Sequence, residues 1–354
     1  AFLGRLAPSL RTLVLRGNAH VGPIPTELGN LTRLRTLDLH DNRLDGPIPD
    51  SLARLPALTS LDLSSNRLAG PIPGFTCPAL SVLDLSRNFL AGPIPAGLRV
   101  LRSLVKLDLS HNNLSGAIPD AVGDLAELIL IDFSHNRLSG PLPRTLPNLK
   151  ALQALILEDS FDPPASTSIP DDAFHGMDRL TTLVLSGMNL HGRIPASVAR
   201  LQSIRVIRLD RNRLDGPIPG SFGELRDLGE LRLNDNRLTG RVPLKRTLVR
   251  RMRRKLRLSN NSGLCFDPEV GFLGGPDPAM DSGIGYCSGA PARTPPSPTT
   301  KTVRHRPRNP AAGGENGESA EESSPAAAVQ RGSLDLQVLV LWISFWFVNC
   351  RLTW

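Results

Sequence analysis

The chain has 354 residues, of which 40% are hydrophobic, 4% aromatic and 21% charged. The formal net charge is +8, but eight cations lie between residues 245 and 257; without them the 41 basic residues fall to 33, equal to the 33 acidic ones. The excess charge is therefore local. Because no aromatic side chains alternate with these cations, the composition argues against a nucleic-acid-binding protein.

A phrase with a period near 24 residues runs through the first two-thirds of the chain. It reads Leu-x-x-Leu-x-Leu-x-x-Asn-x-Leu-x-Gly-x-Ile-Pro, and complete copies begin at Leu34, Leu58, Leu80 and Leu104. A fixed period of this length indicates one supersecondary unit stacked on copies of itself. We therefore predict an α/β solenoid in which residues 1–258 form about ten repeats and a partial eleventh.

Within each repeat, the alternating leucines of Leu-x-Leu predict a short strand, and stacked strands would pair in parallel as a concave sheet. A ladder position follows each strand where the chain turns inward. An asparagine there can donate to and accept from neighbouring backbone groups that the turn would otherwise bury unpaired. The ladder positions are Asn18, Asn42, Asn66, Asn88, Asn112, Asn136, Ser160, Met188, Asn212, Asn236 and Asn261.

The segment Gly-Pro-Ile-Pro that follows each turn should be extended. Glycine permits backbone angles that other residues resist, and each proline fixes φ and restricts the residue before it. After it, a stretch such as residues 50–55 predicts a short outer turn that buries Leu52 and Leu55.

The residue between the two strand leucines is expected to face solvent on the concave side, where a partner would bind. A graded charge along this column would orient a charged partner and raise its association rate. An alternative explanation for the run of aspartates is that aspartate is simply the common residue at this position of the repeat, without a role in binding. In chain order the predicted column is Val14, Asp38, Asp62, Asp84, Asp108, Asp132, Ile156, Val184, Arg208, Arg232 and Arg257.

The middle of the array is irregular. Residues 159–170 replace the usual turn, the ladder interval lengthens from 24 to 28 residues, and Ser160 and Met188 replace two ladder asparagines. We expect weaker local pairing, a change of curvature or an exposed loop. Both a binding loop and a neutral insertion fit this pattern.

A basic patch precedes the end of the array. One interpretation is a solvated face, and another is a docking site for an acidic partner. The patch contains Arg250, Arg251, Arg253, Arg254, Lys255 and Arg257.

Residues 259–287 are predicted to form a C-terminal cap closed by a disulfide between Cys265 and Cys287. Cys77 is expected to be a buried thiol. No Cys-x-x-Cys pair or histidine cluster suggests a metal site, and none is predicted. Glycosylation sequons at Asn30, Asn113 and Asn260 fit a secreted ectodomain.

The two ends carry further expectations. Residues 288–333 are rich in Pro, Ala, Ser, Thr, Gly and charge, which predicts a disordered stalk. Residues 334–354 form a hydrophobic tail. Its apolar core, 336–348, would make about 20 Å of helix, which is short for a membrane span. We expect a membrane anchor or a GPI-type signal with small residues at 326–328. The chain starts within a repeat without Met or an N-terminal cap, so we expect an N-terminal truncation.

The Gly-x-Ile-Pro segment is typical of plant-type leucine-rich repeats, and the resemblance covers residues 1 to about 287. Several stretches, above all 251–258 and 260–265, resemble plant receptor-like proteins that lack a kinase. That resemblance implies a protein on the extracellular face of the cell membrane that acts as co-receptor with leucine-rich repeat receptor kinases of the ERECTA group. It would help perceive secreted cysteine-rich peptides and regulate stomatal patterning.

A runner-up interpretation is a secreted inhibitor of a cell-wall enzyme, of the polygalacturonase-inhibitor type. The stalk and hydrophobic tail argue against it, because a secreted inhibitor needs neither. No Gly-rich phosphate loop, paired-acid site or nucleophile elbow is present, so the sequence predicts neither an enzyme nor a cofactor.

Overall fold

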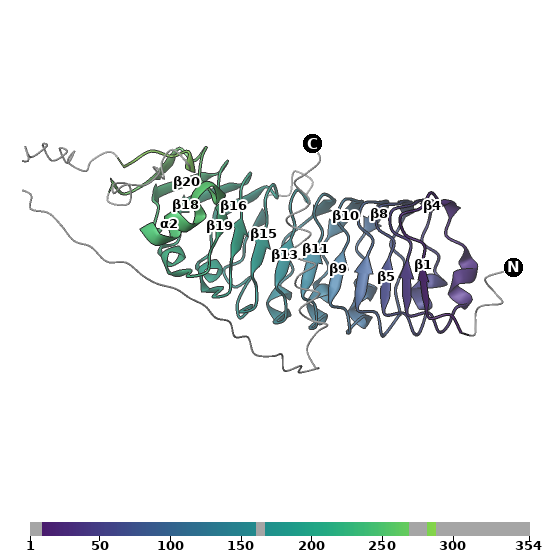
Figure 1. The fold of residues 1–354 in the computed structure, drawn as a ribbon. Helices are drawn as coiled ribbons and strands as arrows, with labels where there is room; N and C mark the ends of the chain where they lie inside the picture. Colours follow the sequence, from purple (N-terminus) through teal and green to yellow (C-terminus); the bar gives the residue numbers. More distant parts are fainter. Residues whose placement is uncertain (1–8, 161–166, 269–281, 288–354) are drawn as a thin grey trace, which may run out of the picture. The chain divides into compact units, whose positions relative to one another are not determined.

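The computed structural model describes residues 9–160, 167–268 and 282–287. Eleven short parallel strands form one sheet, the concave sheet, and their order in the sheet follows the chain from β1 to β21 (Figure 1). The predicted solenoid is confirmed. The strands are β1 (Thr12–Val14), β3 (Thr36–Asp38), β5 (Ser60–Asp62), β7 (Val82–Asp84), β9 (Lys106–Asp108), β11 (Leu130–Asp132), β13 (Ala154–Ile156), β15 (Thr182–Val184), β17 (Val206–Arg208), β19 (Glu230–Arg232) and β21 (Leu256–Arg257).

The repeat places equivalent residues in register. Leu37 pairs with Leu61 and Asp38 with Asp62, and the same offset continues along the sheet. The strand leucines are buried, so each repeat contributes to one continuous hydrophobic core. Because each repeat buries its apolar side mainly against its neighbours, the array is stable only as a stack.

The asparagine ladder is present as predicted. Asn112 donates from Nδ2 to the carbonyls of Leu109 (3.1 Å), Ser110 (3.2 Å) and, in the preceding repeat, Leu85 (3.0 Å). Its Oδ1 accepts the backbone N–H of Leu90, also in the preceding repeat, at 3.0 Å. From Asn42 onward, each ladder asparagine therefore joins its own turn to the turn before it.

A left-handed residue precedes each ladder position. Glycine occupies it at Gly17 and Gly187, but elsewhere the position holds residues with side chains, with φ between 48° and 57°. Such angles are uncommon outside glycine, and the sequence pattern did not reveal them. These residues are Asp41, Ser65, Arg87, His111, His135, Asp159, Arg211, Asp235 and Asn260.

A second set of parallel strands follows the ladder turns, and it is divided in two. The first sheet has six strands: β2 (Val21–Pro23), β4 (Arg43–Gly46), β6 (Arg67–Gly70), β8 (Phe89–Pro93), β10 (Asn113–Ala117) and β12 (Arg137–Ser139). The second has five: β14 (Thr167–Ser168), β16 (Leu190–Arg193), β18 (Arg213–Pro217), β20 (Arg237–Arg241) and β22 (Gly263–Cys265). We call the gap between β12 and β14 the sheet break.

The sheet break coincides with the irregular repeat. At Ser160 the ladder amide is absent, and the N–H of Leu138 is accepted instead by the carbonyl of Ser160 at 2.6 Å. The concave sheet continues across this point, because β13 pairs with both β11 and β15. Weaker pairing is therefore seen only in the second set of strands. The inserted residues 161–166 lie outside the described residues.

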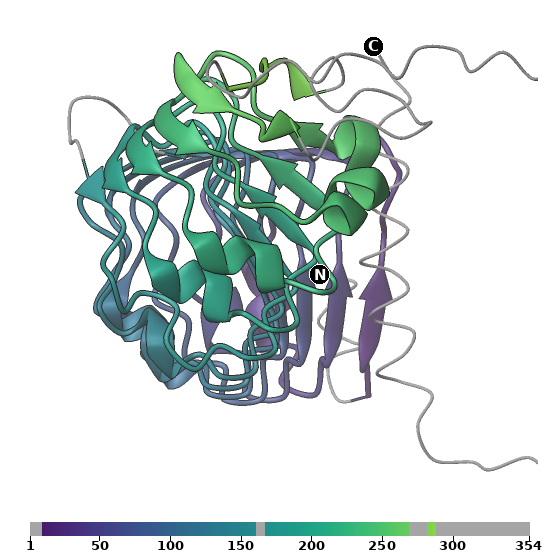
Figure 2. The same ribbon diagram turned by 90° about the vertical axis from the view of Figure 1, so that its left-hand side faces the viewer.

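Short turns close each repeat on the outer side, as expected from Leu52 and Leu55, which are buried. Figure 2 views the repeats along the stack, with turns and strands enclosing a single interior. Cys77 is a buried thiol whose pKa is raised by burial to about 11. The turns are η1 (Thr26–Asn30), η2 (Leu52–Arg54), η3 (Ala96–Val100), η4 (Asp120–Asp124), η5 (Leu146–Asn148), η6 (Ala196–Arg200) and η7 (Gly220–Glu224), followed by the helix α2 (Arg246–Met252) and η8 (Arg253–Lys255).

The C-terminal end of the array is closed by a short cap. Cys265 and Cys287 form a disulfide with 4.9 Å between their Cα atoms. Next to it, Phe266 pairs with Tyr286, and the N–H of Leu258 donates to the carbonyl of Ser282 at 3.0 Å. Residues 288–354, with the predicted stalk and tail, lie outside the described residues. Among the residues described, no helix is long and apolar enough to cross a membrane.

Candidate binding face

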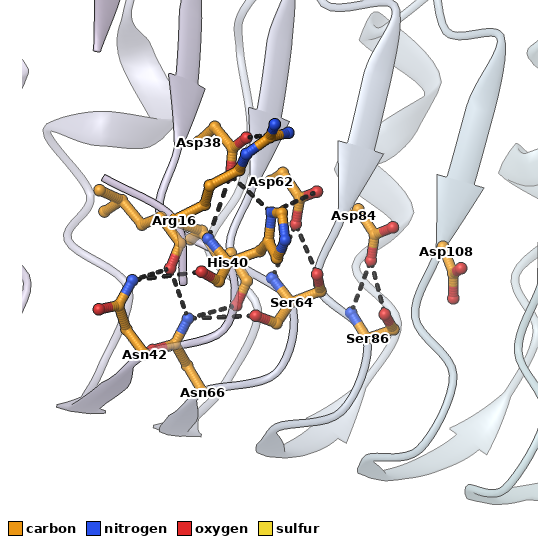
Figure 3. Close-up of polar contacts among 12 residues, drawn as sticks. Arg16, Asp38, His40, Asn42, Asp62, Ser64, Asn66, Asp84, Ser86 and Asp108 are labelled. Carbon is orange, nitrogen blue, oxygen red and sulfur yellow. Dashed lines mark hydrogen bonds and ion pairs between the residues drawn. The ribbon is translucent and has the colours of Figure 1, made fainter. Parts of the chain in front are cut away.

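The aspartates of the predicted binding column accept hydrogen bonds from the turns that follow them. Asp84 accepts two hydrogen bonds on Oδ1, from the N–H of Ser86 at 3.1 Å and from its hydroxyl at 2.7 Å. The same bonds recur between Asp62 and Ser64 (Figure 3). In the next two repeats, the equivalent pairs are Asp108 with Ser110 and Asp132 with Ser134.

Three of these aspartates are buried, contrary to the expectation that the whole column faces solvent. Asp84, Asp108 and Asp132 are 7%, 5% and 5% exposed, whereas Asp38 and Asp62 are partly exposed. The reason is that strands about 4.8 Å apart bring equivalent side chains into contact, and each carboxylate folds back onto its own turn. A partner can therefore reach only the two N-terminal members of the acidic run, Asp38 and Asp62.

Lys106 lies at the centre of this acidic run. Its Nζ is 2.7 Å from Asp84 Oδ2 and 3.8 Å from Asp108 Oδ2. Burial alone would lower the pKa of Lys106, but the two carboxylates raise it overall. Burial, and then the charges of Asp84 and Asp132, raise the pKa of Asp108 to about 8. One lysine thus serves several close carboxylates, and the cluster favours binding a proton.

At the N-terminal end, Asp38, His40 and Asp62 place three potential metal-ligand atoms within 4.8 Å of one another. However, His40 occupies the position that serine holds in the following repeats. Its Nδ1 lies 2.8 Å from Asp38 Oδ1, the oxygen that equivalent serine hydroxyls contact elsewhere (Figure 3). Arg16 Nη1 lies 3.8 Å from the other oxygen of Asp38. The cluster is thus explained as a variant of the repeating hydrogen bond.

The middle of the column is apolar, with Ile156 and Val184 buried. Beside it, Arg211 joins its own repeat to the repeat two positions before it. Its Nη2 lies 2.7 Å from Glu158 and its Nη1 3.1 Å from Asp159, and its Nε lies 3.4 Å from Asp210.

Arg211 reaches the acids two repeats away because the intervening residue, Gly187, has no side chain. A Cβ at Gly187 would also overlap the carboxylate of Asp159. The arginine therefore joins its own repeat to the repeat of Ser160, across the repeat of Met188. Nothing in the sequence pattern indicated this contact, which depends on a side chain spanning two repeats.

Two of the predicted basic members of the column share one acid. Arg208 Nε donates to Glu230 Oε1 at 2.8 Å. Arg232 Nε lies at the same distance from that oxygen but without hydrogen-bond geometry, so Arg232 is held there by charge. The side chain of Glu230 is 8% exposed. Arg208 and Arg232 are thus engaged within the fold and are less available to a partner than the sequence suggested.

An exposed ridge lies beside the column, at the left-handed positions. His111 and His135 stack there with ring centroids 4.2 Å apart. Burial, and then the charges of His135 and Arg87, lower the pKa of His111 to about 4. Nearby in the sequence, at the start of β8, the large apolar side chain of Phe89 is 58% exposed. The sequence predicted neither the stacking of the two histidines nor the exposure of Phe89.

The predicted glycosylation asparagines are all exposed. Asn30 ends the outer turn η1 and Asn113 begins β10. Asn260 donates from Nδ2 to Asp235 Oδ1, which lowers the pKa of that carboxyl. Modification of the three asparagines remains a prediction.

Comparison with known proteins identifies the repeat. Residues 8–68 and 102–160 match a leucine-rich repeat family, and residues 79–101 and 203–225 match another family of the same description. A stretch of 34 residues is 74% identical to the protein TOO MANY MOUTHS of Arabidopsis thaliana, and covers 10% of this chain and 7% of that protein.

Solved structures show the same fold. The crystal structure of PEPR1-AtPEP1 is 34% identical with a TM-score of 0.65, covering 75% of this chain and 36% of that one. The plant peptide hormone receptor RGFR1 in complex with RGF2 is 30% identical with a TM-score of 0.60, covering 75% and 45%. A plant ice-binding protein is 31% identical with a TM-score of 0.65, covering 78% and 84%.

This chain thus spans less than half the length of the two receptor-related chains and a small part of the curated relative. The family matches, the sequential parallel sheet and the asparagine ladder agree with one another. The chain belongs to the leucine-rich repeat family, and it is similar to plant receptor-like proteins built from these repeats.

Proposed function

We propose that this protein is a cell-surface co-receptor. Its ectodomain would bind the ectodomain of a leucine-rich repeat receptor kinase of the ERECTA group and contribute to the perception of secreted cysteine-rich peptides, and so regulate stomatal patterning. The role is one of binding, without catalysis. An extracellular, membrane-associated location agrees with the similarity to plant receptor-like proteins.

One structural observation carries this proposal: the concave sheet is continuous over eleven strands despite the sheet break. Its polar groups are fixed by internal contacts, as at Asp84 and Glu230. Such a surface is pre-organised for a large partner, because little side-chain freedom is lost on association. The similarity to a peptide hormone receptor and to TOO MANY MOUTHS supports a receptor-type partner.

Fold alone does not decide the function, because the same scaffold serves a plant ice-binding protein. The sequence also left open a secreted inhibitor of a cell-wall enzyme. Unlike an inhibitor, a co-receptor would sediment with membranes. Membrane fractionation separates these proposals: release of the full chain without detergent or phospholipase would contradict the co-receptor.

The direct test is co-precipitation of the full chain with a receptor kinase ectodomain of the ERECTA group, with and without a secreted cysteine-rich peptide. We expect capture of the ectodomain, and a change in the amount captured when the peptide is present. A matched ectodomain from an unrelated receptor kinase serves as control. Equal capture of both ectodomains, or of neither, would contradict the proposal.

A further inference from the structure

The structure divides the basic patch into cations that hold the fold and cations that face solvent. Lys245 Nζ lies 3.0 Å from Glu224 Oε1. Arg251 donates two hydrogen bonds, of 3.0 and 2.7 Å, to the carbonyl of Leu228 in the preceding repeat. Four of the other cations are exposed and form no ion pair with the described part of the chain. We call them the cationic edge: Arg253, Arg254, Lys255 and Arg257.

The backbone holds the cationic edge in a fixed place. Helix α2 buries Leu248, Val249 and Met252, and Arg251 fixes the end of the helix to Leu228. The chain then reverses at Arg253, with φ 45° and ψ −123°, a conformation that residues with a Cβ rarely adopt. Packing on both sides must maintain this strained turn. The four charges therefore project from a defined surface and not from a flexible arm.

The cationic edge lies where the concave sheet ends. Strand β21 is the last of the eleven, and Arg257 is in register with Arg232. Elsewhere on this face the cations have acidic partners: Lys106 has Asp84, and Arg232 shares Glu230. These cations of the concave sheet each contact a carboxylate, whereas the four cations at its C-terminal edge contact none in the described part of the chain.

We propose that the cationic edge binds a short, carboxylate-rich segment of a partner protein. Guanidinium groups form paired, charge-assisted hydrogen bonds with carboxylates, and three of the four cations are arginines. The four charges lie within five consecutive residues at one end of the stack, so they fit a short segment better than a polymer that runs along the repeats. This inference rests on the proposed function in one respect: the receptor kinase ectodomain would supply that segment.

A matched control exists on another face. Five exposed arginines each begin a strand of the second set and form no ion pair within the described ranges, and four of them make up the control: Arg43, Arg67, Arg213 and Arg237. They are spread over separate repeats, and Asp45 is in register with Arg67 and Asp215 with Arg237. Replacing these four by serine removes the same charge as replacing the cationic edge, without removing a cluster.

The probe is a fluorescein-labelled peptide, Gly-Glu-Glu-Gly-Glu-Glu-Gly, with the Gln-for-Glu peptide as its neutral control. Binding to the full chain is measured by fluorescence anisotropy in 20 mM and 500 mM salt. The edge variant combines Arg253→Gly, Arg254→Ser, Lys255→Ser and Arg257→Ser, and glycine keeps the turn. Circular dichroism checks that both variants remain folded.

We expect the edge variant to bind the Glu peptide at least about tenfold more weakly than wild type in low salt, because the loss of clustered charge slows association most. The control variant should bind nearly as wild type does, and high salt should abolish the difference. An equal loss in both variants would overturn the proposal, since net charge alone would then explain binding. Equal competition by polygalacturonate, at the same carboxylate concentration, would overturn the assignment to a protein segment.

Capture of the receptor kinase ectodomain separates this inference from the proposed function. If wild type and the edge variant capture the ectodomain equally, the cationic edge is not the docking site, although the co-receptor proposal stands. If wild type captures no ectodomain but still binds the Glu peptide through the edge, the co-receptor proposal fails and the carboxylate site stands.

Discussion

Replacing a single ladder asparagine should destabilise the array markedly, and Asn112→Ala is the best test. The side chain is buried and joins two repeats: Oδ1 accepts the N–H of Leu90, and Nδ2 donates to the carbonyls of Leu85, Leu109 and Ser110. Alanine can replace none of these bonds. The change leaves a buried N–H and several buried carbonyls without their partner.

The expected cost follows from the number of bonds. Nδ2 has two hydrogens, so the amide makes about two full donated bonds shared among three carbonyls, besides the accepted one. At about 1 kcal/mol net for each bond, with a further penalty for the unsatisfied N–H, the total is about 3 to 4 kcal/mol. This is a large fraction of the usual stability of a folded domain.

The control is the adjacent residue. Asn113→Ala alters an exposed asparagine and should change the unfolding free energy by less than about 0.5 kcal/mol. Both proteins are deglycosylated and then compared by urea unfolding and by amide hydrogen exchange at Leu90. If Asn112→Ala costs no more than Asn113→Ala, the ladder reasoning is wrong. The repeat would then be rearranging as at Ser160, where a carbonyl replaces the missing amide.

Three other predictions concern the acidic cluster, the strained turn and the cap. The folded-state pKa of Asp108 is raised to about 8, so the folded protein holds a proton that the unfolded chain releases above about pH 4. The unfolding free energy should therefore fall as pH rises from 4 to 8, by up to about 1.4 kcal/mol per pH unit. Urea unfolding of Asp108→Asn should show a flatter dependence of this free energy on pH. Arg253→Gly removes the side chain that makes a positive φ unfavourable, so it should raise the free energy of unfolding by about 1 kcal/mol. A loss of stability would show that the turn is not strained. Reducing the bond between Cys265 and Cys287, which are 22 residues apart, should cost about 3 kcal/mol, and peptide mapping before and after reduction shows whether the two are joined.

The fold was predictable because its determinants are local. The spacing of the leucines indicated parallel strands, and the ladder asparagines appeared where the turns needed them. Gly46 and its equivalents have the positive φ that their place in the repeat suggested. The same reasoning anticipated an irregularity at Ser160, although the pattern could not say that only the second set of strands would be interrupted.

The site was less predictable because it depends on contacts between repeats. The sequence marks Asp84 and Arg208 as members of one column, but not that the first is buried or that the second shares Glu230 with Arg232. Side-chain length, curvature and glycine at position 187 decide which charges meet. The position of a residue in the repeat predicts where its side chain points. It does not predict the electrostatic partner, which lies one or two repeats away.

The sheet break also affects how the molecule comes apart. In a linear array, stability is a sum of the intrinsic stability of each repeat and of the contacts with its neighbours. At the junction before Ser160, the neighbour contact has lost the bonds of a ladder asparagine and its second-sheet pairing, and retains the β11–β13 pairing and the bond from Leu138 N–H to the carbonyl of Ser160. Unfolding that begins in the N-terminal repeats should therefore pause at this junction, leaving the disulfide-closed half folded as a separate cooperative unit.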